Sequence, residues 1–145
     1  SMRAAAKENP AEGAEAFARW YIETLSYLYQ HPKAGVLDRY AGEDCNTCAR
    51  HVRVVQQSAE QNAQADKAVY EVLGAGEPHS MGDGYEITVA FRQNASVIRD
   101  EAGSVVGKTT ELPEVGYVFR LAYDKGWTIE KMHPNDAPYY EPDAS

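Results

Sequence analysis

Residues 10–30 read PAEGAEAFARWYIETLSYLYQ and decide the fold, because they predict one long amphipathic helix. Asn9 suits the N-cap, Pro10 suits the first helical position, and Glu12 completes a capping-box pattern. The pair His31-Pro32 ends the helix. Apolar residues recur at the helical spacing of three and four positions, at Ala14, Phe17, Ala18, Tyr21, Leu25 and Leu28. We therefore expect the helix to be buried along this stripe.

Two shorter helices are predicted to follow. The first places Val36, Leu37 and Tyr40 inward and ends before Gly42. The second runs from about Cys45 to Gln64, with Asp44 as its expected N-cap. Its apolar stripe faces the core and its other face carries arginine, glutamine and glutamate, so the sequence predicts three helices in the amino-terminal half.

From residue 67 onward the apolar period changes to two, which is typical of strands. Tyr85, Ile87, Val89 and Phe91 share one strand face. Residues 100–103 predict a hairpin turn, Pro113 is expected to break the next link, and residues 115–123 and 127–131 form the last strands. The sequence therefore predicts an α+β fold, in which three helices pack against a curved antiparallel sheet that wraps the first helix as a cone.

The length and charge restrict the classes of protein. The chain has 145 residues and a mass of 16.0 kDa, the size of one domain. We assign residues 1–9 to a linker remnant, 10–133 to one α+β domain, and 134–145 to a Pro/Tyr-containing tail that is either free or docked. The net charge of −8 excludes nucleic acid as an expected partner, because no basic cluster offsets it. Ser1-Met2 reads as a trimmed start, no signal peptide is present as written, and no apolar run approaches a membrane span.

The order of elements, ending in YVFRLAYDKGWTIEKM at residues 117–132, resembles the nuclear-transport-factor-2-like fold of the cystatin-like superfamily. The resemblance covers about residues 10–133, and it includes a Trp just after the last turn, here Trp127. It implies a cone whose mouth can hold a ligand. Enzymes of that fold, such as isomerases and dehydratases, place an acid or base beside tyrosine at this mouth.

EGAEAFARWYIETLSYLY followed by DCNTCARH resembles an uncharacterised family of actinobacterial secreted lipoproteins with a domain of unknown function. The matching positions are Glu12, Gly13, Phe17, Ala18, Tyr21, Cys45 and Cys48. The resemblance implies an extracytoplasmic protein, tethered by a lipid anchor or secreted, and it supplies no activity. This chain lacks the leader and the lipid-bearing Cys, so membrane contact is expected only through an anchor outside the given sequence.

Cys45 and Cys48 lie three residues apart at the start of a predicted helix. In the compartment that the resemblance implies, we interpret them as a structural disulfide. Two alternatives stay open, a redox-active pair and a zinc site with His51. No fourth zinc ligand is evident, and no βαβ context precedes Cys45, so we expect no metal and no cofactor.

Candidate pocket residues come from the aromatic side chains and one histidine. The set consists of Trp20, Tyr21, Tyr27, Tyr40, His51 and Tyr117. Core packing and a boundary position are the competing interpretations for Tyr21, Trp20 and His51. Glu23, Glu86 and Arg120 are further candidates for a catalytic acid or base. Glu86 and Arg120 alternate with apolar neighbours in strands, so we expect them to face solvent. The sequence predicts no catalytic residue.

Two functions remain as hypotheses. The first is a non-catalytic extracytoplasmic binding or interaction module, whose partner is a small molecule or a cell-envelope protein. The alternative is a small-molecule-binding protein or an isomerase- or dehydratase-type enzyme that uses the cone. A homodimer through the open sheet face is also expected to be possible, with Thr88, Thr109, Thr110, Tyr117 and Arg120 as contact residues if they share that face.

Overall fold

The structure is a computed structural model that describes residues 10–144. The linker 1–9, with the expected cap Asn9, lies outside this range. Helix α2 spans Pro10–Gln30, as the sequence predicts, and helix α3 spans Asn46–Gln61. The described strands are β1 Gln64–Ala65, β2 Tyr70–Ala75, β3 His79–Met81, β4 Gly84–Gln93, β5 Ser96–Arg99, β6 Val105–Thr109, β7 Leu112–Tyr123, β8 Trp127–Asn135 and β9 Glu141–Pro142.

The described residues contain two α-helices rather than the three predicted. The expected middle helix is a single 3-10 turn, η1, at Asp38–Tyr40. The chain leaves this turn at once, because Ala41 is extended and the Gly42 N–H donates to the Ile129 carbonyl of β8 at 2.9 Å. Val36, Leu37 and Tyr40 do pack against the core. The backbone after the turn, however, forms its hydrogen bond with a distant strand instead of continuing a helix.

The strands form two sheets in which every pairing between named strands is antiparallel. The larger sheet has the order β8-β7-β4-β2-β9, with β3 paired to β4. The smaller sheet has the order β1-β5-β6. The predicted break at Pro113 is wrong, since Pro113 is the second residue of β7. It lies at a register shift between Phe91 and Gln93, where proline disrupts the hydrogen-bond ladder least.

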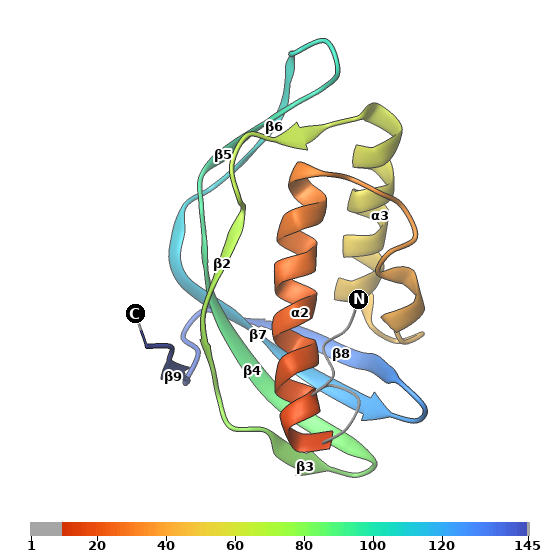
Figure 1. Ribbon diagram of the computed structural model, residues 1–145, viewed down its shortest axis with the longest axis vertical. Helices are drawn as coiled ribbons and strands as arrows, with labels where there is room; N and C mark the ends of the chain where they lie inside the picture. Colours follow the sequence, from red (N-terminus) through yellow and green to blue (C-terminus); the bar gives the residue numbers. More distant parts are fainter. Residues whose placement is uncertain (1–9, 145) are drawn as a thin grey trace.

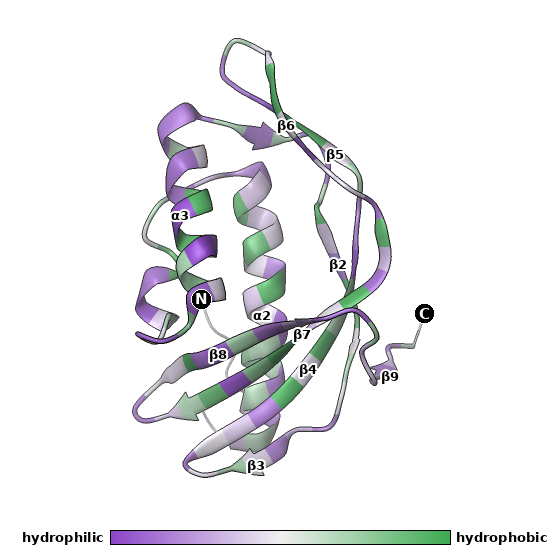
Figure 2. Ribbon diagram, turned by 180° about the vertical axis from the view of Figure 1, so that it is seen from behind, coloured by the Kyte–Doolittle hydropathy of each residue, from purple (hydrophilic) through white to green (hydrophobic). Residues whose placement is uncertain are grey.

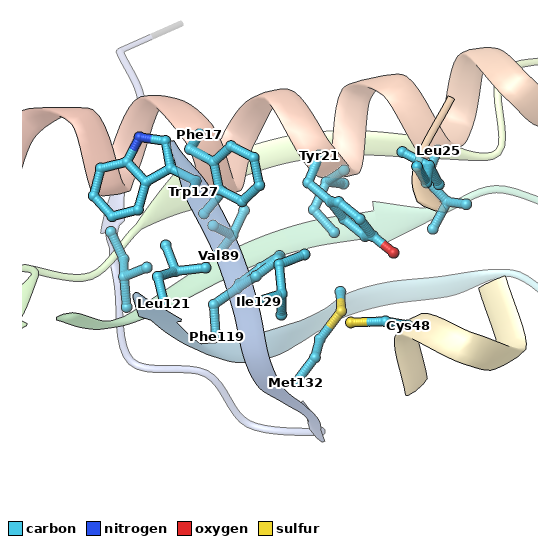
Figure 3. Packing of buried hydrophobic residues seen from close by; sticks show 14 of the residues in the cluster. Phe17, Tyr21, Leu25, Cys48, Val89, Phe119, Leu121, Trp127, Ile129 and Met132 are labelled. Carbon is cyan, nitrogen blue, oxygen red and sulfur yellow. The ribbon is translucent and has the colours of Figure 1, made fainter. Parts of the chain in front are cut away.

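Helices α2 and α3 lie side by side against the larger sheet, with α2 over β2 and β4 and α3 against β8 (Figure 1). Its buried stripe includes Phe17, Tyr21 and Leu25, which pack against inward residues of β4, β7 and β8. Strands β4 and β7 alternate between hydrophobic and hydrophilic residues, as Figure 2 shows, because only one of their faces meets the helix. Figure 3 shows this core, with Phe17 beside Trp127 and with the Tyr21 hydroxyl directed toward α3.

Candidate functional site

A buried polar cluster joins three elements inside the core. Tyr21 of α2, His51 of α3 and Tyr117 of β7 meet there. The Tyr21 hydroxyl lies 2.8 Å from His51 Nδ1, and the Tyr117 hydroxyl lies 3.4 Å from His51 Nε2. A neutral imidazole has one donor and one acceptor nitrogen, so one tyrosine donates to the ring while the other accepts from it. Both nitrogens of the only buried histidine in the described part are thus occupied.

Burial keeps this cluster uncharged at neutral pH. It lowers the pKa of His51 to about 4, with a smaller contribution from the positive charge of Arg50. Burial also raises the pKa of both tyrosines, Tyr21 and Tyr117, although Arg50 opposes the shift at Tyr117. A histidine with so low a pKa is a weak base, so the cluster favours a structural hydrogen-bonded unit over proton transfer.

Aromatic rings fill the space around the cluster. Phe119 meets Tyr21 edge to face at 5.8 Å between ring centroids, and Phe91 lies 5.6 Å from Tyr117. Tyr70 continues this row with a ring centroid 4.9 Å from that of Phe91. Every buried side-chain nitrogen or oxygen in residues 10–144 has a hydrogen-bond partner. The buried side-chain polar groups of the described interior therefore satisfy one another.

A solvent-facing hollow lies at the carboxyl end of α2. We call it the helix-end groove, and its volume is about 500 Å³. Tyr27 forms an exposed part of it, with 59% of its surface accessible, and its ring lies 4.7 Å from that of His31. Its lining combines aromatic and aliphatic side chains with hydrogen-bonding groups and one lysine, from Trp20, Thr24, Tyr27, Leu28, His31, Pro32, Lys33, Val36, Asn62 and Gln64.

A second hollow of about 370 Å³ adjoins the helix-end groove and shares His31 and Gln64 with it. Its far end carries Asp66, Asp100 and Glu101 beside a single arginine, Arg99. The lining of the helix-end groove contains Lys33 but no carboxylate, so the two hollows differ in charge.

Five of the six candidate pocket residues separate into two groups, and Tyr40 belongs to neither. Trp20 and Tyr27 line the helix-end groove, whereas Tyr21, His51 and Tyr117 form the buried cluster. Tyr40 packs behind the groove, with ring centroids 5.4 Å from Phe17 and 5.1 Å from Trp20. The sequence analysis missed His31, Asn62 and Gln64 as lining residues, although the i, i+4 spacing of Tyr27 and His31 on one helix face was a usable signal.

The residues expected on the open sheet face do not share one surface. Tyr117 points into the core toward His51, and Thr109 belongs to β6 of the smaller sheet, where its hydroxyl donates to the Asn94 carbonyl. Thr88 and Arg120 lie on the larger sheet, and Arg120 is 3.7 Å from Glu86 across β4 and β7. That pair is exposed, as the strand alternation predicted.

Cys45 and Cys48 form a disulfide, as predicted. Both residues are buried, and Cys45 rather than Asp44 is the N-cap of α3, since its sulfur accepts from the Cys48 N–H at 3.2 Å. The sulfur atoms are bonded to each other and thus are not zinc ligands. A disulfide is typical of proteins outside the reducing cytoplasm.

Removing this disulfide should destabilise the protein without preventing folding. Closing so short a loop restricts the unfolded chain by on the order of 2 kcal/mol in the loop-entropy picture. The double substitution Cys45→Ser with Cys48→Ser is expected to lower the melting temperature by several degrees, measured by circular dichroism. A double variant as stable as the parent under oxidising conditions would show that the cross-link contributes nothing.

None of the helices in residues 10–144 is both long enough and apolar enough to span a membrane. Among curated proteins, no sequence matches the chain. Among solved structures, the chain is similar to the intermembrane space region of the chloroplast protein ARC6, with a TM-score of 0.58 and 15% sequence identity. The match covers 86% of this chain and 95% of that one, and at this identity it shows a shared fold alone.

The sequence profile of one family matches residues 1–133, which is most of the chain and includes both helices and the strands through most of β8. That family is described as a family of unknown function, DUF6318. The match spans the segments that supply the helix-end groove, the buried cluster and the disulfide. The chain therefore belongs to the family of unknown function DUF6318.

Proposed function

We propose that the chain is a non-catalytic binding module that acts outside the cytoplasm and takes its ligand in the helix-end groove. One observation carries this proposal: the exposed Tyr27–His31 ring pair borders a hollow lined by both apolar and hydrogen-bonding groups. Pockets of this composition bind the flat faces of small molecules and fix them by a few hydrogen bonds. The ligand is a small polar molecule or a segment of a cell-envelope protein.

The disulfide supports the extracytoplasmic placement. We further propose that the protein is tethered by a lipid anchor outside the given sequence, and that the two sheets and α2 correspond to the nuclear-transport-factor-2-like cone. In such a cone the helix-end groove lies at one end of α2, beside β1. Sheet-face dimerisation stays a prediction, with Thr88, Thr110 and Arg120 as its remaining contact residues.

The isomerase- or dehydratase-type alternative depends on the buried cluster. The hydrogen bond from His51 to the half-buried Tyr117 is the observation in its favour. Two facts weigh against it: His51 has a pKa of about 4, and its second nitrogen is held by Tyr21. A base of this kind abstracts protons poorly at neutral pH, so binding is the function that the geometry supports better.

Substitution of Tyr27 tests the groove. A library of soluble fragments screened by two-dimensional NMR should produce hits that shift the amide signals of Tyr27 and His31. Tyr27→Ala should weaken those hits about tenfold, which corresponds to about 1.4 kcal/mol, because the stacking platform is lost. Tyr139→Ala is the control, since Tyr139 is an even more exposed tyrosine that does not line the groove.

The result that would contradict the proposal is equally specific. Hits that shift His51 and Tyr117 but leave Tyr27 unchanged would place binding in the core and would favour the enzyme alternative. Equal affinity of a groove-directed hit for the parent and for Tyr27→Ala would show that the groove does not bind it.

A further inference from the structure

The carboxy-terminal segment crosses the larger sheet over three glycines, Gly74, Gly76 and Gly116, which we call the tail track. A Cβ on Gly116 would lie 3.0 Å from the Pro138 side chain, and one on Gly76 would lie 3.1 Å from the Tyr139 carbonyl. A Cβ on Gly74 would overlap the Glu141 carbonyl. The segment therefore needs a glycine at position 74, and it packs tightly against the other two positions.

The end of the segment pairs with β2 as a strand. In β9, Glu141 pairs with Ala75 and Pro142 with Gly74, at the edge of the larger sheet (Figure 1). The Asp143 N–H then donates to the Leu73 carbonyl at 2.8 Å. This is the hydrogen-bonding pattern by which an extended peptide adds to an exposed sheet edge.

Three side chains of the segment give this docking its specificity. Pro138 is buried against Gly116. The Tyr140 hydroxyl donates to Glu114 Oε2 at 2.8 Å, and Asp143 accepts two hydrogen bonds from the Arg19 guanidinium at 2.9 and 2.8 Å. The track thus recognises an extended backbone with the spacing Pro-x-Tyr-x-x-Asp.

The chain's own segment is held by contacts that a peptide of the same spacing would replace one for one. Strand β9 has only two residues, so it adds few ladder hydrogen bonds, and the bidentate Arg19–Asp143 pair is partly exposed on both sides. When the segment leaves, it uncovers an unpaired edge of β2, which is a template for another strand.

We propose that the tail track is a docking site for an extended peptide of a second polypeptide with the spacing Pro-x-Tyr-x-x-Asp, and that residues 138–143 occupy the site in cis as its competitive cover. The family profile ends at residue 133, so the cover lies beyond the part of the chain that the profile matches, whereas the three glycines lie within it. The proposal is independent of the helix-end groove, since the lining residues of the groove contribute nothing to the track.

A labelled peptide with the sequence of residues 136–144, DAPYYEPDA, tests the proposal on the full-length chain. In the unmodified chain the tethered segment competes at an effective concentration of about the millimolar range, so the peptide should bind weakly. In the Asp143→Arg chain the new guanidinium lies beside that of Arg19, and the repulsion releases residues 138–143 from the track. This chain should bind the peptide at least tenfold more tightly than the unmodified chain, measured by fluorescence anisotropy. Asp136→Arg is the matched control, because Asp136 is an exposed carboxylate of the same segment that lies outside the recognised spacing.

Substitutions in the peptide test the same contacts without changing the stability of the protein. Peptides that carry Asp143→Asn or Tyr140→Phe should each bind the Asp143→Arg chain three- to tenfold more weakly than the parent peptide. Amide shifts on binding should fall on residues of β2 and β7. The proposal is overturned by equal affinity for the Asp143→Arg and Asp136→Arg chains, by the absence of binding to either, or by shifts confined to Tyr27 and His31.

Discussion

Phe17→Ala should lower the free energy of unfolding by about 4 kcal/mol, measured by urea denaturation at neutral pH. Phe17 is fully buried, and its ring lies between those of Trp20 and Trp127, at centroid distances of 5.8 and 6.0 Å. Removing it deletes the contact through which α2 meets both η1 and the start of β8. The rigid rings around it refill the space poorly, so the cavity cost adds to the loss of burial.

Tyr27→Ala is the control for this experiment, because Tyr27 is an aromatic residue of the same helix that is largely exposed. It should change the free energy of unfolding by less than about 0.5 kcal/mol. A loss below about 1.5 kcal/mol for Phe17→Ala would contradict the packing of α2 inside the sheets. The Tyr27→Ala variant is also used in the ligand screen. An unchanged free energy of unfolding would show that any loss of binding there is not caused by unfolding.

The second large effect is acid destabilisation through His51. Its pKa falls from the ordinary value of 6.5 to about 4 on folding, so below pH 6.5 the unfolded chain binds a proton that the folded chain does not. The stabilisation by neutral His51 is complete above about pH 7 and decreases as the pH falls toward 4. By pH 4 this one group should cost about 3 kcal/mol.

Urea denaturation at pH 7 and pH 4 isolates this contribution when the parent is compared with His51→Gln. The glutamine variant is less stable at pH 7, since a buried hydrogen-bonded ring is lost, but its stability should decline less between the two pH values. Carboxylates that release stability in acid, such as Asp143 whose pKa Arg19 lowers, act equally in both proteins and cancel. His79→Gln, at an exposed position, should retain the full pH dependence of the parent. An unchanged pH dependence in His51→Gln would show that His51 is not buried neutral.

Helix bounds could be predicted where capping residues and apolar spacing within the helix itself determine them. The bounds of α2 follow from a cap-compatible start, an uninterrupted apolar stripe and the terminating His31-Pro32. Helix α3 ended three residues before its predicted limit, because Asn62 adopts a left-handed backbone conformation with φ of 50°. The failures at Asp38–Tyr40 and Pro113 have one cause, namely that hydrogen bonding to distant strands overrides short local patterns.

The sites divide in the same way. Cys45 and Cys48 were assigned as a disulfide from their spacing together with the family resemblance, and they are bonded. The helical stripe places Tyr21 inside and leaves Tyr27 off it, but the sequence positions do not reveal which distant residues each tyrosine meets. Tyr27 and Tyr21 lie on the same helix, yet one is exposed and the other is buried against His51, because α3 and β7 cover only one side of α2.

The sequence by itself determined the class of the protein: a mixed α+β domain with one long helix and antiparallel strands. These depend on periodicity, capping and neighbouring residues, which the chain carries locally, whereas the disulfide was expected only with the compartment that the family resemblance implies. Only the tertiary structure decided that His51 is held between two tyrosines, that the helix-end groove gathers residues from α2 and from the end of α3, and that the carboxy-terminal segment fits over three glycines. Each of these brings together positions far apart in the chain, and their proximity arises from packing that no local pattern encodes.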